Sequence, residues 1–254
     1  MTYSIGIDSG STATKGILLA DGVITRRFLV PTPFRPATAI TEAWETLREG
    51  LETTPFLTLT GYGRQLVDFA DKQVTEISCH GLGARFLAPA TRAVIDIGGQ
   101  DSKVIRLNED GSVKNFVMND KCAAGTGRFL EMMAKTMEMS LDELSKVELS
   151  YQEDITISSM CTVFAESEVV SLIAQNKEIA DIAHGIHKAI AGKAMSLLKR
   201  VGLNPGYMMT GGVAKNPGVV AVLEEQLGEK LHIYEEPEIV GALGAALYGL
   251  EEIL

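Results

Sequence analysis

The sequence predicts an α/β protein made of two similar lobes. Its 254 residues, 46% of them hydrophobic, suffice for one large domain or for two compact lobes of about 100–150 residues each. A segment near the N-terminus recurs in the middle of the chain, which indicates two copies of one supersecondary unit. Helical apolar spacing lies between and after these copies, and strands that alternate with helices are typical of an α/β fold.

The repeated segment covers residues 7–19 and 95–107, which align without gaps. An aspartate, a glycine and a lysine recur at matched positions, and the apolar alternation after the lysine coincides as well. This recurrence favours a shared function, with two ordinary glycine-rich hairpins as the alternative. The matched residues are Asp8 with Asp96, Gly10 with Gly98, and Lys15 with Lys103.

Each copy has the pattern of a strand, a small-residue turn, a second strand and a short third strand. Small residues at such a turn let backbone N–H groups point at an anion, so the sequence predicts two phosphate-binding loops. The expected strands cover 3–7, 15–19 and 22–23 in the first copy, and 93–97, 103–107 and 111–113 in the second.

The other elements follow in chain order. Apolar spacing predicts a helix over 37–51, a strand over 56–60, and a turn at 61–63 that leads into a helix. A long amphipathic helix is expected over 181–201, and a strand over 207–210. A Gly-Gly turn at 211–212 precedes an Asn-Pro helix start, and a helix of small residues is expected over 241–250.

Charge and cysteine content exclude several functional classes. A net charge of −10 and a pI of about 5.0 disfavour binding to nucleic acid or to an anionic membrane surface. The sequence has no signal-peptide pattern and no apolar run near the roughly 20 residues that span a membrane. We therefore expect a cytoplasmic protein, and its odd number of cysteines argues against a disulfide framework.

The two hairpins, together with the Gly211-Gly212 turn after a strand, resemble the actin, sugar kinase and Hsp70 ATPase superfamily. This resemblance implies two ribonuclease-H-like lobes with a nucleotide cleft between them. The first lobe would comprise residues 1–90 and 240–254, and the second residues 91–239. ATP and Mg²⁺ are the implied ligands.

The same resemblance implies residue roles. The first hairpin would hold the phosphates, the two aspartates would organise Mg²⁺ and its waters, and Gln100 or Asp96 would position the attacking water. The implied catalytic residues are Asp8, Asp96 and Gln100. The implied nucleotide-binding residues are Gly10, Ser11, Thr12, Lys15, Gly98, Gly99, Gly127, Gly211, Gly212, Lys215 and Asn216.

Two of the three cysteines, Cys122 and Cys161, follow capping-type residues and precede helical apolar patterns. A helix N-terminus favours a thiolate, and thiolates bind metal–sulfur clusters. A [4Fe–4S] cluster usually takes four cysteines, which a two-fold homodimer would supply from two per chain. Buried or incidental cysteines are the alternative.

The segments 119–129 and 161–169, with the two hairpins, resemble the activators (component A) of 2-hydroxyacyl-CoA dehydratases and the related ATPase subunits of benzoyl-CoA reductase. This resemblance implies a homodimer with one [4Fe–4S] cluster held by Cys122 and Cys161 of both chains. ATP would drive a low-potential electron into a partner dehydratase or reductase, with ferredoxin or flavodoxin as the upstream donor. Cys79 has no cluster role in that pattern and is interpreted as structural.

Two other functions stay open from the residues alone. One is a small-molecule kinase of the same superfamily, which would need an acceptor pocket and no cysteines. The other is a regulatory ATPase without redox chemistry, in which Cys122 and Cys161 bind zinc or nothing.

Overall fold

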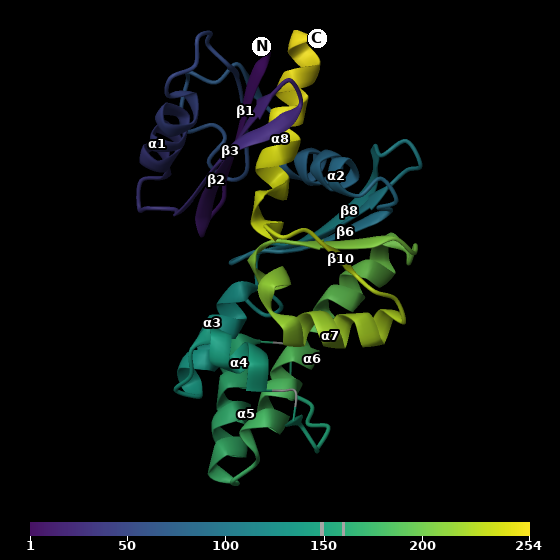
Figure 1. The fold of residues 1–254 in the computed structure, drawn as a ribbon. Coiled ribbons are helices and arrows are strands. Elements are labelled where there is room, and N and C mark those ends of the chain that lie inside the picture. The colour runs from purple at the N-terminus through teal and green to yellow at the C-terminus, as the bar shows by residue number, and fades with distance from the viewer. Residues whose placement is uncertain (148–149, 159–160) are drawn as a thin grey trace. The chain divides into compact units, whose positions relative to one another are not determined.

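The computed structural model describes residues 1–147, 150–158 and 161–254, and the chain divides into two compact units. Unit 1 comprises residues 1–94, 107–114 and 234–254, and unit 2 comprises residues 95–106 and 115–233. The chain carries two five-stranded sheets (Figure 1).

The first sheet has the strand order β3-β2-β1-β4-β5. The first three strands pair antiparallel, whereas β4 runs parallel to β1 and β5 runs parallel to β4. The pairing of β1 with β2 sets Asp8 opposite Lys15, which is why these two residues recur at a fixed spacing. The strands are β1 (Tyr3–Ser9), β2 (Ala13–Ala20), β3 (Val23–Pro31), β4 (Phe56–Thr60) and β5 (Lys72–Gln73).

Helices cover both faces of this sheet (Figure 1). Helix α1 (Pro36–Arg48) packs on one face, and α8 (Val240–Ile253) packs on the other. Neighbouring β2 residues divide between the two faces: Leu18 joins the α1 core, and Leu19 joins the α8 core, as the two-residue period of a strand requires. Helix α2 (Glu76–Leu87) packs against α8.

The second sheet has the order β10-β9-β6-β7-β8, which repeats the first sheet with β6 in the place of β1 and β9 in the place of β4. Its hairpin therefore presents the second Asp–Gly–Lys segment in the same setting. The strands are β6 (Ala93–Ile97), β7 (Ser102–Leu107), β8 (Val113–Asn119), β9 (Tyr207–Thr210) and β10 (His232–Ile233).

Most other helices belong to unit 2, and α6 is the longest of those described. It packs against α4, α5 and α7, and α3 packs against α5. Within the described ranges, no helix is long and apolar enough to cross a membrane. These elements are α3 (Gly127–Thr136), α4 (Leu141–Val147), α5 (Thr162–Ala174), α6 (Ile179–Val201), α7 (Pro217–Leu227) and the short 3-10 helices η2 (Gly212–Lys215) and η3 (Pro237–Ile239).

The strands predicted at 56–60, 93–97 and 207–210 have the observed bounds. Three local predictions are wrong, one of them the strand expected over 111–113, which is β8 (Val113–Asn119) and begins only after the turn at Gly111. The turn at 61–63 does not lead into a helix, because turns and bends precede the short strand β5, and α2 begins only at Glu76. Asp21 and Gly22 form the hairpin turn with φ values of 47° and 81°, so the third strand begins at Val23 and is longer than predicted.

Candidate nucleotide and cysteine sites

The first hairpin holds a partly buried ion pair. Lys15 Nζ lies 3.1 Å from Asp8 Oδ2, and the Asp8 side chain is 6% exposed. The turn closes through a hydrogen bond from Gly10 N to the Ala13 carbonyl at 3.1 Å. Ser11, at the tip of the turn, is exposed, as is the neighbouring Thr12. The hairpin thus combines exposed hydroxyls with a lysine whose carboxylate partner already lies beside it.

Thr32, directly after β3, holds the tip of this hairpin. Its backbone N–H donates to the Thr12 carbonyl at 2.9 Å, and its hydroxyl donates to the Gly10 carbonyl at 2.8 Å. A single threonine after a strand has no distinctive pattern, so Thr32 could not be predicted from the sequence. The register that sets Ala13 opposite Pro31 is what brings it to the turn.

The second hairpin has the same turn hydrogen bond, from Gly98 N to the Asp101 carbonyl at 2.9 Å. Its lysine is more enclosed: Lys103 Nζ lies 2.9 Å from Asp96 Oδ2 and 2.7 Å from Asp101 Oδ2, with 3% of the side chain exposed. Thr210, from β9, donates its hydroxyl to Asp96 Oδ1 at 2.7 Å. Gln100, between these residues in sequence, is exposed.

The first turn of α3 is hydrogen-bonded to the second hairpin. Gly127 N donates to the Gly98 carbonyl and Arg128 N donates to the Gly99 carbonyl, both at 2.8 Å. A Cβ on Gly127 would lie 3.2 Å from both the Gly98 carbonyl oxygen and the Gly99 Cα. Gly127 therefore supports the turn of the second hairpin through its backbone.

The Gly-Gly turn follows β9. Gly211 has a φ of 83°, and a Cβ there would lie 2.4 Å from the Ile97 carbonyl oxygen, so only glycine suits this position. Gly212 and Lys215 are exposed. Asn216 is buried and caps α7, because its Oδ1 accepts the Val219 backbone N–H at 3.0 Å.

The loop that contains Cys122 is held in place through its backbone carbonyl groups. The Asn119 side-chain amide donates to the carbonyls of Cys122, at 2.8 Å, and Ala124, at 3.2 Å. Thr126 is the N-cap of α3, and its hydroxyl donates to the Ala123 carbonyl at 2.7 Å. Cys122 thus lies in a loop before the N-cap and not at the start of the helix. The predicted stabilisation of its thiolate by the helix dipole therefore does not apply.

Cys161 is the N-cap residue of α5, as predicted, and its side chain makes no capping hydrogen bond. Both Cys122 and Cys161 are free thiols of intermediate exposure. In the part of the chain that the structure describes, no three His, Cys, Asp or Glu side chains are grouped to hold a metal ion.

Cys79 differs from the other two cysteines. It is fully buried in α2, and this burial raises the pKa of its thiol to about 12. A thiol with such a pKa stays protonated at neutral pH, and the thiolate is the form that binds metals. These properties fit a structural role for Cys79.

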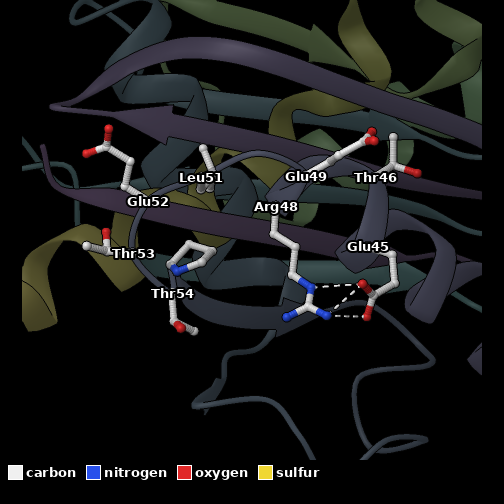
Figure 2. A pocket seen from close by; sticks show the side chains of 9 residues that line it. Glu45, Thr46, Arg48, Glu49, Leu51, Glu52, Thr53 and Thr54 are labelled. Atoms are coloured by element: carbon white, nitrogen blue, oxygen red, sulfur yellow. Dashed lines mark hydrogen bonds and ion pairs between the residues drawn. The ribbon is translucent and has the colours of Figure 1, made fainter.

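An open concavity of about 600 Å³ lies on unit 1. Its lining residues come from a segment of the sequence that contains neither hairpin. Figure 2 shows Arg48, near the end of α1, paired with Glu45 through both carboxylate oxygens. No residue of the predicted nucleotide site lines this concavity. Its lining residues are Glu45, Thr46, Arg48, Glu49, Leu51, Glu52, Thr53, Thr54 and Pro55.

A model of the BadF/BadG/BcrA/BcrD ATPase family matches residues 5–249. The chain belongs to this family. Among its relatives, YjiL of Escherichia coli K12, an uncharacterised protein, is 63% identical over 98% of this chain and 97% of its own length.

Solved structures of this ATPase family agree with the fold. Component A of (R)-2-hydroxyglutaryl-CoA dehydratase from Acidaminococcus fermentans is 45% identical, with a TM-score of 0.92 and coverage of 99% of both chains. The activator of 2-hydroxyisocaproyl-CoA dehydratase from Clostridium difficile, with bound ADPNP, is 43% identical, with a TM-score of 0.90 and coverage of 99% and 95%.

A ROK family glucokinase from Streptomyces griseus shares only the fold, at 14% identity, a TM-score of 0.63 and coverage of 98% of this chain and 99% of its own. The predicted α/β fold class, of the actin, sugar kinase and Hsp70 ATPase type, is confirmed.

Proposed function

We propose that this ATPase is an electron-transfer activator that works as a homodimer with one bridging [4Fe–4S] cluster. Two solved relatives that span nearly the whole chain are named as a dehydratase activator, solved with bound ADPNP, and as component A of a dehydratase. The observation that carries the proposal is the link between the second phosphate loop and α3, the helix that follows the Cys122 loop.

The nucleotide part of the proposal rests on the two Asp–Lys pairs. Both lysines lie beside an aspartate, and a phosphate bound at the first hairpin would share the Lys15 cation, which is already held in place. We propose that Asp8 and Asp96 organise Mg²⁺ through its waters, because Mg²⁺ keeps several waters and uses few carboxylates. Exposed Gln100 would orient the attacking water, since phosphoryl transfer depends on positioning and electrostatics.

Among the remaining predicted residues, the glycines would act through their backbone and Asn216 through its side chain. Gly10 and Gly98 close the two turns, and Gly99 accepts a hydrogen bond from α3. The Gly211–Gly212 turn would border the adenosine with Lys215, and Asn216 would hold this border in place by capping α7. We propose that residues 1–90 with 240–254, and residues 91–239, are the two functional lobes.

The thiols of Cys122 and Cys161 fit a [4Fe–4S] cluster in kind and in number per chain. Both are free and partly exposed, and a second chain would supply the other two ligands. When bound, such a cluster supplies one-electron transfer. Asn119 and Thr126 hold the Cys122 loop through its carbonyl groups, so they would keep that ligand in position.

Coupling between the two sites would run through unit 2. Any displacement of the Gly98–Gly99 loop acts on the first turn of α3, because two hydrogen bonds join them and no side chain separates them. The Cys122 loop precedes that turn and would move with it. We propose a dehydratase or reductase as the electron acceptor, and ferredoxin or flavodoxin as the donor.

Anaerobic purification of the Cys122→Ala variant tests the proposal. The wild-type protein should be brown and contain about two iron atoms per chain, as one cubane per dimer requires. Cys122→Ala and Cys161→Ala should lose the iron and keep ATP binding, because neither thiol belongs to the hairpins. Iron analysis and calorimetric ATP binding measure both properties.

The matched control is Cys79→Ala, which removes the buried thiol that takes no part in the proposed cluster. It should keep wild-type iron content. A colourless wild-type preparation that takes up no iron on reconstitution would contradict the cluster. If Cys122→Ala also lost ATP binding, the separation of the two sites would be wrong.

A further inference from the structure

The turn after β4 lies directly against the first hairpin. Gly61 has a φ of 83°, and a Cβ there would lie 2.4 Å from Asp8 Oδ1 and 2.7 Å from the Ser9 carbonyl oxygen. Gly63 N donates to the same Ser9 carbonyl at 3.0 Å, and a Cβ on Gly63 would lie 2.2 Å from Ser9 Oγ. Neither glycine can carry a side chain unless Asp8 or Ser9 shifts.

Unit 2 has the same arrangement within itself. Gly211 also has a φ of 83°, and its Cβ would lie 2.4 Å from the Ile97 carbonyl oxygen and 3.1 Å from Asp96 Oδ1. Strands β4 and β9 are the corresponding neighbours of β1 and β6, and each ends in a threonine that is followed by this glycine. The internal repeat therefore includes a Thr–Gly turn beside each aspartate.

The Asp8 carboxylate is enclosed by backbone on both oxygens. Oδ1 faces Gly61, while Oδ2 accepts from Lys15 and lies 3.0 Å from the place of a Cβ on Gly241. Arg64 closes the turn, because both its backbone N–H, at 3.3 Å, and its Nη1, at 3.1 Å, donate to the Gly61 carbonyl. The carboxylate consequently has little freedom to rotate.

We propose that the 61–64 turn is a positioning element of the ATPase reaction, which fixes the Asp8 carboxylate where it organises Mg²⁺. The proposal rests on the role proposed above for Asp8. Gly61 sets the position of Oδ1, and Gly63 sets the position of Ser9. Both are positioning residues, because they act through their neighbours.

The test is the Mg²⁺ concentration that gives half-maximal ATP hydrolysis at saturating ATP. Gly61→Ala should raise this concentration about tenfold or more, because a displaced catalytic carboxylate loses its geometry. Gly50→Ala is the matched control: Gly50 also has a positive φ, of 71°, but no atom lies within 4 Å of its Cβ position. It should lose similar stability and keep the wild-type Mg²⁺ requirement.

Gly63→Ala provides a second test without positive-φ strain, and Gly192→Ala, where no atom lies near the Cβ position, is its control. Gly63→Ala should also raise the Mg²⁺ requirement, and it decides the matter if Gly61→Ala does not fold. A folded Gly61→Ala or Gly63→Ala with the Mg²⁺ requirement of its control would overturn the proposal. Asp8→Asn distinguishes failure of the proposed turn role from failure of the proposed role of Asp8. If Asp8→Asn leaves the Mg²⁺ requirement unchanged, the proposed role of Asp8 itself is wrong.

Discussion

Lys103 lies between two carboxylates, with only 3% of its side chain exposed. Removing one partner of a buried ion pair leaves an uncompensated charge, which costs about 3–5 kcal/mol. We therefore expect Lys103→Met to lower the free energy of unfolding by an amount of that order, measured by urea denaturation. Lys15→Met should cost less, because Lys15 is 16% exposed.

Lys146→Met is the control for this comparison. Lys146 pairs with Asp142 on the surface, with side chains 64% and 73% exposed, and such pairs contribute about 0–1 kcal/mol. Equal losses for Lys103→Met and Lys146→Met would contradict the burial argument.

Cys79 gives a prediction for alkaline pH. Burial raises the pKa of its thiol from 9.0 to about 12, so the folded protein keeps the thiol protonated while the unfolded chain ionises it. Stability should therefore fall as the pH rises above 9.0, by up to roughly 1.4 kcal/mol per pH unit until the folded pKa is reached. In iron-free protein, Cys79→Ala should lack this component and Cys161→Ala should keep it. Identical slopes of unfolding free energy against pH in the wild type, Cys79→Ala and Cys161→Ala would refute this contribution of Cys79.

The sequence could predict residues that recur in one contiguous segment, and it missed those that meet through strand pairing. Asp8, Gly10 and Lys15 were predictable because the hairpin repeats them at fixed spacing. Thr32 and Thr210 reach the two hairpins only because strand pairing brings them there. Each is a single residue, which forms no recognisable sequence pattern. The match of Thr60-Gly61 with Thr210-Gly211 is equally short, and it becomes visible only when β4 and β9 are known to be equivalent neighbours.

Helices α2 and α8 meet at glycines, which lets their backbones approach closely. A Cβ on Gly244 would lie 1.8 Å from the Cys79 carbonyl oxygen, which is backbone and cannot move aside. Gly244→Ala should lower the free energy of unfolding by about 3 kcal/mol or more. Gly192→Ala, in α6, meets no atom and should stabilise the protein by up to about 1 kcal/mol, because alanine is the better helix former. A loss of stability in Gly192→Ala, or none in Gly244→Ala, would contradict this view of the packing.

The element type followed from the apolar period where a segment was long and regular, as in the 23-residue helix α6. The helix expected after residues 61–63 is the main failure. Glycine turns are common starts of helices, but here the turn is committed to the first hairpin through Gly63 and Ser9. That tertiary contact cannot be read from local pattern.

At the scale of the whole molecule, the two sheets repeat one strand order, and each carries one Asp–Gly–Lys hairpin. The repeat is broken in unit 2, where α3 to α6 follow β8 and bring both proposed cluster ligands. We propose that the repeated part carries the phosphate chemistry and that the segment between β8 and β9 carries the redox chemistry. The contacts of α3 with the Gly98–Gly99 loop join the two within one unit.

The most direct test of this account is electron paramagnetic resonance of the anaerobic, dithionite-reduced protein with Mg-ADP or Mg-ADPNP. We predict a signal from one reduced cluster per two chains, and a change in its spectrum or midpoint potential between the two nucleotides. Loss of that nucleotide response in Gly127→Ala, with iron content kept, would locate the coupling at α3. A cluster signal that is identical with both nucleotides, or no cluster signal at all, would contradict the central claim.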